Sequence, residues 1–249
     1  MSMDHVIIKI DNLRREFIVG GEKVKALRGV SFQIRNGEFV TIMGTSGSGK
    51  STLLNLLGCL DTPTSGEYVL DGVSVQSMSK NQRAVTRNRK IGFVFQNYNL
   101  LPKTTAIENV ELPLLYNTSV CAKERREKAV AALEAVGLGD RLNHKSNQMS
   151  GGQQQRVAIA RALVNDPVII LADEATGNLD TRTSFSILML FQELHAKGRA
   201  IIFVTHNPEL AYYSSRNIVL RDGKIVSDTM NSNPASAREA FDNLPKDND

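Results

Sequence analysis

The stretch that decides the fold is Gly44-Thr45-Ser46-Gly47-Ser48-Gly49-Lys50-Ser51. It matches the pattern G-x-x-x-x-G-K-[ST], in which a glycine-rich loop surrounds the phosphates of a nucleotide. A strand-like run, residues 38–43, precedes it, and a helix-like run, residues 51–57, follows it. The sequence therefore predicts a strand, a phosphate-binding loop and a helix, with backbone N–H groups and the helix N-terminus facing the anion.

Two side chains at the end of this loop have the chemistry to bind a nucleotide together with Mg²⁺. The ammonium group of Lys50 is a point charge for the β- and γ-phosphates, and the hydroxyl of Ser51 can ligate the metal. A Gly- and Ser-rich turn before an ordinary helix is the alternative, and the flanking strand argues against it. The residues expected to contact the nucleotide here are Gly44, Thr45, Ser46, Gly47, Ser48, Gly49, Lys50, Ser51 and Thr52.

A second pattern places two carboxylates at the end of a buried strand. Residues 168–172 form a continuous apolar run, which is typical of a parallel strand buried on both faces, and Asp173 and Glu174 follow it. Open α/β sheets bind ligands at the carboxyl ends of their strands. We therefore expect Asp173 to hold Mg²⁺, directly or through water, and Glu174 to polarise a water for attack on the γ-phosphate. Taken alone, the run is equally compatible with a strand that ends in a solvated acidic turn.

A third segment, Met149-Ser150-Gly151-Gly152-Gln153-Gln154-Gln155-Arg156, opens an amphipathic helix that we expect to reach about residue 165. Ser150 is a suitable N-cap, and Pro167 follows the helix end. The segment resembles the Leu-Ser-Gly-Gly-Gln signature of the ATP-binding cassette (ABC) ATPases, and the resemblance spans about residues 6–226. The residues that it implies contact the ATP of a second copy are Ser150, Gly151, Gly152 and Gln153.

The resemblance implies roles for further positions. Gln96, after the strand-like run 91–95, is similar to the glutamine that senses Mg²⁺ and the γ-phosphate, and His206 is similar to the switch histidine. Residues 177–180 resemble the loop that contacts the opposite subunit, and Phe17 stands where the family places an aromatic that stacks on adenine. The implied catalytic set is Lys50, Gln96, Glu174 and His206, and the implied metal set is Ser51, Gln96 and Asp173.

Four positions depart from the usual family pattern. Ala175 stands where proline usually follows the glutamate, and this can loosen the backbone that holds Glu174, because proline would fix φ at about −65°. Met149 replaces leucine, which is a mild change of similar volume. Phe17 replaces the commoner tyrosine but keeps the stacking face, and Asn207 replaces aspartate. We expect a competent site in which Ala175 is the main weakness.

More narrowly, the chain resembles the ATPases of the lipoprotein-release, macrolide-export and cell-division group, through segments 58–61, 91–96, 108–113 and 177–180. The resemblance implies a homodimer with ATP at its interface and Mg²⁺ as cofactor. It also implies integral membrane permease subunits as partners and a peripheral location on the cytoplasmic face of the inner cell membrane. The implied docking surface is the segment 97–102, which includes apolar and aromatic residues. From these residues alone, a loop that faces the core is an equally good interpretation.

Two other functions remain compatible with the sequence. The first is a soluble ABC ATPase that acts on ribosomes or nucleic acid. One cassette without sustained heptads argues against it, so no nucleic-acid partner is expected. The second is a regulatory ATPase that signals to a membrane complex without moving a substrate, and the sequence does not separate it from a transporter.

Length and composition fit one large α/β domain of 249 residues, 41% hydrophobic and 22% charged. No apolar run reaches the roughly 18 residues of a membrane span, and the first residues do not have the pattern of a secretory signal. Cys59 and Cys121 lack metal-ligand spacing, so reduced thiols are expected. The net charge is +4, and its densest cluster, at residues 83–90, fits either a solvated helix face or a contact with an anionic partner.

The predicted fold is a P-loop NTPase α/β core, with a mixed sheet that includes an antiparallel part, plus a helical subdomain that carries the signature. We expect one ABC ATPase domain over residues 5–228. Its core comprises about residues 5–96 and 166–228, and its helical subdomain comprises about residues 97–165. A loosely ordered tail with a short helix is expected over 229–249.

Periodicity and turn residues place further elements. Asn36-Gly37 and Asp71-Gly72 are turn signals between strand-like runs, so the first part of the chain is expected to contain antiparallel pairs. Asp222-Gly223 predicts a hairpin. Helices are expected over residues 106–116, 122–136 and 181–197.

Overall fold

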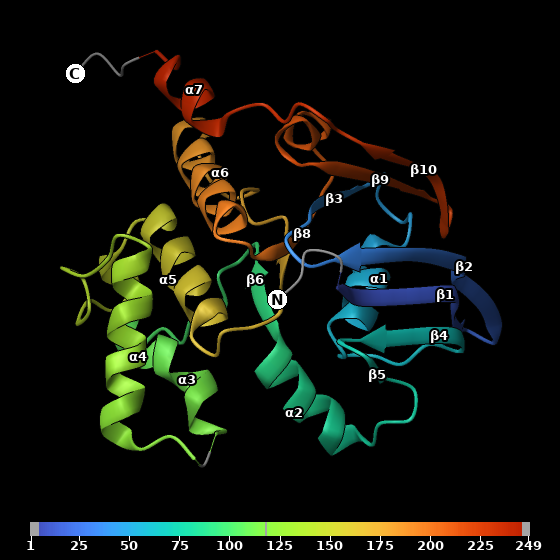
Figure 1. The fold of residues 1–249 in the computed structure, drawn as a ribbon, viewed down its shortest axis with the longest axis horizontal. Helices are drawn as coiled ribbons and strands as arrows, with labels where there is room; N and C mark the ends of the chain where they lie inside the picture. Colours follow the sequence, from blue (N-terminus) through green and yellow to red (C-terminus); the bar gives the residue numbers. More distant parts are fainter. Residues whose placement is uncertain (1–4, 118, 246–249) are drawn as a thin grey trace.

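The central element of the computed structural model is a six-stranded sheet in the order β10-β9-β3-β8-β7-β6 (Figure 1). The neighbouring strands from β9 to β6 pair in parallel, and β10 pairs antiparallel with β9. The structure describes residues 5–117 and 119–245. The strands are β3 (Phe39–Met43), β6 (Ile91–Phe95), β7 (Ile169–Asp173), β8 (Ala200–Thr205), β9 (Arg216–Arg221) and β10 (Lys224–Met230).

A second, antiparallel sheet has the order β2-β1-β4-β5. Its long first hairpin turns at Gly20 and Gly21, which both have positive φ, and glycine adopts this conformation without a steric cost. Helix α1 (Lys50–Leu57) is packed between the two sheets, because its leucines share one hydrophobic cluster with side chains of both. The strands are β1 (Val6–Val19), β2 (Glu22–Arg35), β4 (Ser65–Leu70) and β5 (Val73–Ser74). The predicted mixed sheet with an antiparallel part is confirmed.

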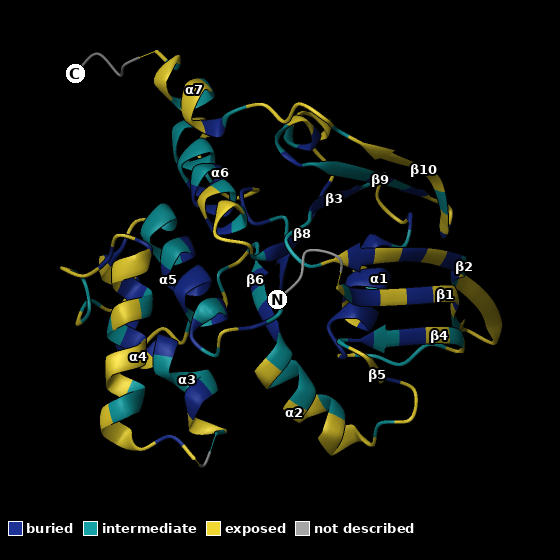
Figure 2. Cartoon of the chain, in the orientation of Figure 1, coloured by how far each residue is buried: buried dark blue, intermediate teal, exposed yellow. Residues whose placement is uncertain are grey.

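The parallel strands are covered on both faces, as the continuous apolar run 168–172 predicted (Figure 2). Along β7, Ile169 and Leu171 pack in the cluster that contains α1. Ile170 and Ala172 point to the opposite face and pack in the cluster formed with the helices. Because alternate residues of a strand face opposite sides, this burial fixes the register of the strand that ends at the two carboxylates.

Helices cover the second face and extend from it. The segment between β6 and β7 is mostly helical, as expected, and its buried residues share one cluster with the sheet residues Ile170 and Phe203. The division of the chain into a core and a helical subdomain remains a prediction. The helices are α2 (Lys80–Lys90), α3 (Ala106–Leu115), α4 (Ala122–Ala135), α5 (Gly151–Leu163), α6 (Thr181–Ala196) and α7 (Ala237–Asp242), with 3₁₀ turns at Ser146–Gln148 and Pro208–Tyr213.

One of the two expected turns in the first part of the chain does not join an antiparallel pair. Asp71-Gly72 joins β4 to β5 as predicted, but Asn36-Gly37 connects β2 of one sheet to β3 of the other. The physical reason is burial: β3 is apolar along most of its length and belongs between two covered faces, whereas β2 alternates between buried and exposed residues. The same part of the chain also contains α2, which carries the basic cluster at residues 83–90.

The C-terminal segment differs from the expected loose tail. Strand β10 continues to Met230, and α7, close to the expected short helix, packs against α6 at the edge of the molecule (Figure 1). The amide of Gln192 on α6 donates to the carbonyl of Ala235 and accepts from the N–H of Ala237. Local composition does not reveal tertiary contacts of this kind. The polar sequence alone therefore indicated a loosely ordered tail. Residues 246–249 lie outside the described residues.

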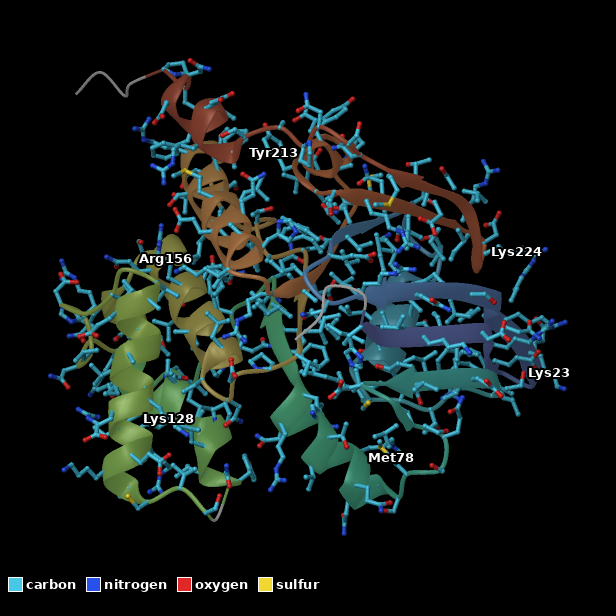
Figure 3. The ribbon with its side chains drawn as sticks, in the orientation of Figure 1. Lys23, Met78, Lys128, Arg156, Tyr213 and Lys224 are labelled. Carbon is cyan, nitrogen blue, oxygen red and sulfur yellow. The ribbon has the colours of Figure 1, made fainter. Side chains whose placement is uncertain are left out.

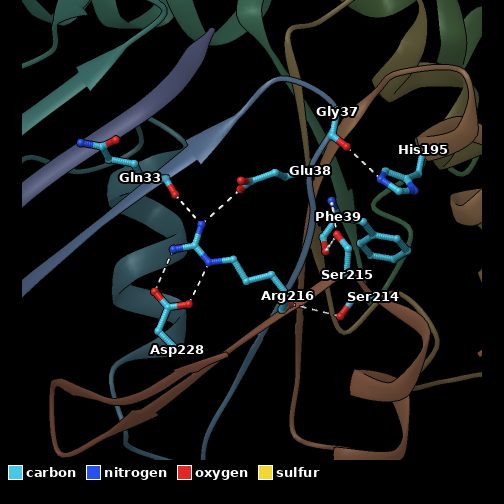
Figure 4. A network of polar contacts seen from close by, with 9 residues as sticks. All are labelled: Gln33, Gly37, Glu38, Phe39, His195, Ser214, Ser215, Arg216 and Asp228. Atoms are coloured by element: carbon cyan, nitrogen blue, oxygen red, sulfur yellow. Dashed lines mark hydrogen bonds and ion pairs between the residues drawn. The ribbon is translucent and has the colours of Figure 1, made fainter. Parts of the chain in front are cut away.

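A charged network joins the two sheets at the start of β9 (Figure 4). The guanidinium of Arg216 forms two hydrogen bonds with Asp228 on β10, at 2.7 and 2.8 Å. It also donates to the Gln33 carbonyl on β2 at 2.7 Å and to Glu38 at 3.2 Å. These partners raise the pKa of Arg216, the hydrogen bond to Asp228 most of all. The network fixes the corner at which the chain passes from one sheet to the other.

The two thiols lie in different surroundings. Cys59 is buried just beyond α1, and this burial raises its pKa to about 11, although Arg87 and Arg83 oppose the shift. Cys121 is exposed at the position that precedes α4.

Within the described residues, no helix combines the length and the apolar composition required to cross a membrane.

Candidate nucleotide site

The residues predicted to form the site follow the strands at one edge of the six-stranded sheet. Because β3, β6, β7 and β8 are parallel, their carboxyl ends lie at the same edge. The phosphate-binding loop, residues 44–49, follows β3. Gln96 follows β6, and His206 follows β8. Asp173 ends β7, with Glu174 directly after it. The structure therefore brings together side chains that are far apart in the sequence. Lys50 and His206, for example, are separated by 156 residues.

Two glycines of the phosphate-binding loop are required by close packing. A Cβ atom at Gly44 would collide with the carbonyl oxygen of Leu220. A Cβ atom at Gly49 would lie 2.6 Å from the carbonyl oxygen of Ala26, and Gly49 also has φ of 104°. Both obstacles are backbone atoms that cannot move aside, so only glycine lets the loop pass here.

Lys50 begins α1 and is 8% exposed. Its ammonium group donates to the carbonyl oxygens of Gly44 at 2.6 Å and Thr45 at 2.9 Å, so it lies inside its own loop. Burial lowers the pKa of Lys50, while Glu174 and Asp173 act in the opposite direction. The lysine charge is thus placed between the phosphate-binding loop and the two carboxylates. Ser51 is exposed and Thr52 half-buried in the first turn of the helix.

The surroundings of Asp173 shift its pKa. Burial raises its pKa, the neighbouring Glu174 raises it further, and Lys50 partly opposes both effects. A carboxylate in such surroundings gains from a nearby cation. Among residues 5–117 and 119–245, no cluster of three or more His, Cys, Asp or Glu side chains could hold a metal unaided.

The donor set of the site nevertheless fits Mg²⁺. This ion is usually held by one or two carboxylates together with phosphate oxygens and waters, not by a cage of protein groups. Asp173 offers a carboxylate, Ser51 a hydroxyl and Gln96 an amide oxygen, so all three donors are the hard oxygen ligands that Mg²⁺ prefers.

Glu174 and His206 form a direct pair. The Nδ1 atom of His206 lies 2.8 Å from Oε1 of Glu174, and the histidine is the more exposed partner. Glu174 has φ of 45°, which is a left-handed conformation that is uncommon for a residue with a side chain. Its N–H donates to the Val204 carbonyl at 2.9 Å, and a cleft of about 330 Å³ opens beside the pair. The backbone of Glu174 is therefore held in place, and its carboxylate can be reached from the cleft.

Gln96 is tied to the loop that follows Glu174. Its Nε2 donates to Oδ1 of Asn178 at 3.1 Å, and the Asn178 amide donates back to the Gln96 carbonyl at 3.2 Å and to Asn97 at 2.8 Å. A Cβ at Gly177 would lie 2.7 Å from the Gln96 amide nitrogen. Because Nε2 is engaged with Asn178, the amide atom suited to a metal is Oε1.

The signature segment begins α5 and is distant from the phosphate-binding loop of the same chain. Ser150 and Gln153 form a capping box, with Ser150 Oγ accepting from the Gln153 N–H at 3.3 Å and Gln153 Oε1 accepting from the Ser150 N–H at 3.0 Å. Gly151 packs beside the Tyr98 hydroxyl, and Gly152 packs against Thr183. In Figure 1, α5 and α1 lie on opposite sides of β6 and β8. The structure therefore does not bring the signature residues to Lys50 within one chain.

Phe17 lies near the end of β1, away from the paired carboxylates, and is half-buried. The guanidinium of Arg15, two residues earlier on the same strand face, lies 4.5 Å from the centre of its ring. Arg15 in turn makes two hydrogen bonds to Asp61, at 2.8 and 2.9 Å. Sequence reasoning missed this support, although the i, i+2 spacing of a cation and an aromatic on a strand is a readable signal.

Sequence reasoning also missed three side chains of α5. Gln155 donates to the Ala175 carbonyl at 2.7 Å, next to the acidic pair. Arg161 donates to the carbonyls of Tyr98 and Asn99, at 2.7 and 2.6 Å, and both of these residues have positive φ. Arg156, labelled in Figure 3, donates to the Val136 carbonyl and to Ser186 and so joins α5 to its helical neighbours. Nothing in local sequence indicates these partners, because each lies at least 20 residues away.

A cleft of about 680 Å³ lies between α2, β6, α3 and α5. Two of its lining residues join α2 to α3, because the Asn88 amide donates to the Pro113 carbonyl at 3.0 Å. The expected docking segment 97–102 contributes Asn99 to the lining, whereas Tyr98 and Leu101 do not line it. The apolar side chains of the cleft include Leu60, Val85, Phe93 and Tyr116, and its basic side chains include Arg87, Arg89 and Arg161.

The chain is similar to proteins of one family over most of its length. Residues 27–177 match the family model described as ABC transporter. An uncharacterized ABC transporter ATP-binding protein of Thermotoga maritima is 57% identical over 88% of this chain and 93% of its own length. The macrolide export ATP-binding/permease protein MacB of Hyphomonas neptunium is 52% identical over 94% of this chain, which spans only 36% of that longer protein.

Solved structures agree with the sequence comparison. A dimeric ATP-binding cassette in a post-hydrolysis state, bound to ADP and Pi, superimposes with a TM-score of 0.82 at 45% identity, over 90% of this chain and 98% of that one. A second dimeric structure of the same protein, described as a bacterial ABC transporter cassette, gives the same TM-score at 46% identity. With the phosphate-binding loop, the paired carboxylates and the signature helix in the positions described, the chain belongs to the ABC transporter family as an ATPase subunit.

Proposed function

We propose that this ATPase binds ATP with Mg²⁺ and hydrolyses it with Glu174 as general base. The observation that carries the proposal is the contact between Glu174 and His206, placed beside Asp173 at the same edge of the sheet as Lys50. A carboxylate held in one position can accept a proton from a water aimed at the γ-phosphate. His206 donates from Nδ1 to that carboxylate when it carries a proton there, and so orients it.

Each of the other groups has a task that its position supports. Lys50 exchanges its hydrogen bonds to the loop carbonyls for phosphate oxygens, and the backbone N–H groups of residues 44–49 surround the same anion. Ser51, Gln96 and Asp173 would hold Mg²⁺, which neutralises charge on the phosphates when it is bound. Phe17 stacks on the adenine, with Arg15 supporting its ring.

The complete site requires two copies of the chain. Helix α5, which the signature residues 150–153 open, lies on the opposite side of β6 and β8 from α1, which begins at Lys50 (Figure 1). The similar cassette of known structure is described as dimeric in both of its structures. We infer that ATP is bound between two copies, with the capped N-terminus of α5 from one copy facing the γ-phosphate held by the other.

The free energy of ATP hydrolysis drives conformational changes in integral membrane permease subunits. The relative MacB is a macrolide export ATP-binding/permease protein, so its name joins an ATP-binding part and a permease in one protein, and this chain matches about a third of it. The cleft between α2 and α5 offers apolar and basic side chains of the kind that a partner's segment can contact. We place the chain as a peripheral subunit at the cytoplasmic face of the inner cell membrane, where it works in export, lipoprotein release or a related task.

The composite site is tested with Glu174→Gln in the full chain. This variant keeps the size of the side chain but removes the base, so ATP should persist and hold two copies together by mass action. Light scattering after size exclusion should show a dimer with Mg·ATP and a monomer without it. Adding Ser150→Arg should abolish the dimer by filling the phosphate position. A monomer that retains bound ATP at high protein concentration would contradict the two-copy site.

The docking cleft is tested separately with Val85→Glu. Val85 is 51% exposed and lines the cleft, so a charge there should not disturb the core. The matched control is Val73→Glu, at a valine that is 53% exposed but outside the cleft. Co-purification from membranes should recover a permease subunit with the wild type and the control but not with Val85→Glu. Equal recovery with all three proteins would place the docking surface elsewhere.

A further inference from the structure

Gln155 is the largest polar side chain buried in α5. It is 0% exposed, and its Nε2 atom donates to the carbonyl oxygen of Ala175 at 2.7 Å. Ala175 directly follows Glu174 and is itself 2% exposed. We propose that Gln155 is a positioning residue for Glu174, which acts by holding the backbone of the turn that carries the general base. The proposal rests on the proposed role of Glu174.

The turn that follows β7 needs such support, because its backbone is in an uncommon conformation. Glu174 has φ of 45°, and this left-handed conformation is sterically unfavourable for a residue other than glycine. The local restraints are the Glu174 N–H, which donates to Val204, and the Gly177 N–H, which donates to the Glu174 carbonyl. Residue 175 is alanine, so the ring of a proline does not restrict the chain here. The hydrogen bond from Gln155 restrains the carbonyl of this very residue.

The amide of Gln155 is not explained by packing. Its Oε1 atom is buried, and among the described residues it has no hydrogen-bond partner. A buried acceptor without a partner destabilises the fold, so an apolar side chain of similar shape would serve the core at least as well. The functional contact of this side chain is therefore the one that Nε2 makes with Ala175.

The effect of this hydrogen bond should appear in the chemical step and not in nucleotide binding. Lys50 is held by carbonyls of its own loop and makes no hydrogen bond to the 174–177 turn among the described residues, so we expect phosphate affinity to change little. The position of the Glu174 carboxylate beside His206 does depend on it, and a misplacement of about 1 Å at a catalytic group can reduce turnover about a hundredfold. Loss of the hydrogen bond should lower kcat and leave KM for ATP nearly unchanged.

The primary variant is Gln155→Met, which conserves volume and removes the donor. We expect kcat to fall about tenfold to a hundredfold, with KM for ATP changed less than about threefold. The matched control is Gln154→Met. The amide of this neighbour also donates to a backbone carbonyl, that of Met149 at 3.1 Å, but far from the acidic turn. The control should retain kcat. Gln155→Asn, which is one methylene too short to reach, should lose turnover as Gln155→Met does.

Rescue separates a positioning role from a general structural one. Ala175 is not among the residues with positive φ, and its N–H makes no hydrogen bond among those found in the described residues. Ala175→Pro should therefore be tolerated and should stiffen the same turn. We expect Ala175→Pro to restore much of the kcat lost in Gln155→Met while changing the wild type little. The two substitutions should then depart from additivity by more than about twofold.

The outcomes are distinct. If Gln155→Met and Gln155→Asn keep wild-type kcat, or if Ala175→Pro gives no rescue while the protein remains folded by thermal unfolding, the positioning role is wrong. If Glu174→Gln itself keeps near-normal turnover, the proposed base is wrong, and the inference about Gln155 fails with it. Loss of turnover in Glu174→Gln with no effect at Gln155 overturns only the inference made here.

Discussion

The phosphate-binding loop and the acidic turn after β7 lie at one edge of the sheet, but they are held in different ways. Lys50 is bound by carbonyls five and six residues away, and the loop passes through gaps that only glycine fits. The acidic turn is held by Gln155, 20 residues away, and by His206, 32 residues away. The Lys50 side chain is thus held within its own loop, whereas the acidic turn is held by side chains from α5 and from the end of β8.

This difference separates binding from chemistry. A lysine that is held by carbonyls of its own loop does not rely on side chains of distant elements for its position. A base that is held by distant elements works only when those elements are correctly packed. Movement of α5, which begins at the signature Ser150, is therefore expected to alter turnover more than nucleotide affinity.

The largest effect should come from the acidic turn itself. Glu174→Gln should reduce kcat by about 10²- to 10⁴-fold, the usual contribution of a general base, while ATP still binds. Phosphate release under saturating Mg·ATP measures the first quantity, and equilibrium binding of a fluorescent ATP analogue measures the second. A parallel loss of affinity would show that the two regions are not separate.

The reverse pattern is expected in the phosphate-binding loop. Lys50→Ala removes a charge-assisted contact that contributes about 1.5–3 kcal/mol, so the Kd for ATP should rise about 10- to 150-fold. Lys128→Ala, on α4 and labelled in Figure 3, removes a lysine far from the loop and should leave Kd unchanged. Calorimetric titration with ATP compares the two variants. Unchanged ATP affinity in Lys50→Ala would remove Lys50 from the binding site.

A smaller effect should arise at the long-range restraint of the Gln96 loop. Arg161→Met removes the donor to the carbonyls of Tyr98 and Asn99 and should lower kcat about tenfold without changing ATP affinity. Arg156→Met removes an arginine from the same helix that contacts only structural neighbours, and it should lower Tm more than kcat. Steady-state kinetics and thermal unfolding of the pair decide whether the contact of Arg161 is specific to turnover.

The smallest effect concerns stability and pH. Burial and Glu174 raise the pKa of Asp173, so in the folded protein this carboxylate binds its proton more tightly than in the unfolded chain. Its contribution to stability is therefore fully present below the unfolded pKa and is lost as pH rises through the folded pKa. Asp173→Asn should flatten that part of the pH profile. At neutral pH without nucleotide, where the wild-type protein has lost that contribution, Asp173→Asn should raise Tm. A lower Tm for Asp173→Asn than for the wild type at neutral pH would contradict the expected direction of the effect.

The parts of the site that could be predicted from sequence are those with local causes. The loop around Lys50, the carboxylates after residues 168–172 and the cap at Ser150 each depend on residues within a few positions. Parallel strands then explain why Gln96 and His206 lie near them.

The remaining features depend on tertiary packing. Some contacts join elements whose relative positions no local pattern encodes. They are the hydrogen bond from Gln155 to Ala175, the hydrogen bond from Arg161 to Asn99 and the network around Arg216. The segment after residue 228 shows the same limit, because its polar composition did not reveal the contact between Gln192 and Ala235.

The unequal chemistry of the two cysteines makes the chain a natural single-label protein. A thiol with a pKa of about 11 holds almost no thiolate at neutral pH, and Cys59 is also enclosed. Cys121 is exposed at the start of α4, so a maleimide dye or spin label should attach there without any substitution. A reporter on α4 of each copy would record how the helical part of one cassette approaches that of the other as nucleotide is bound and hydrolysed.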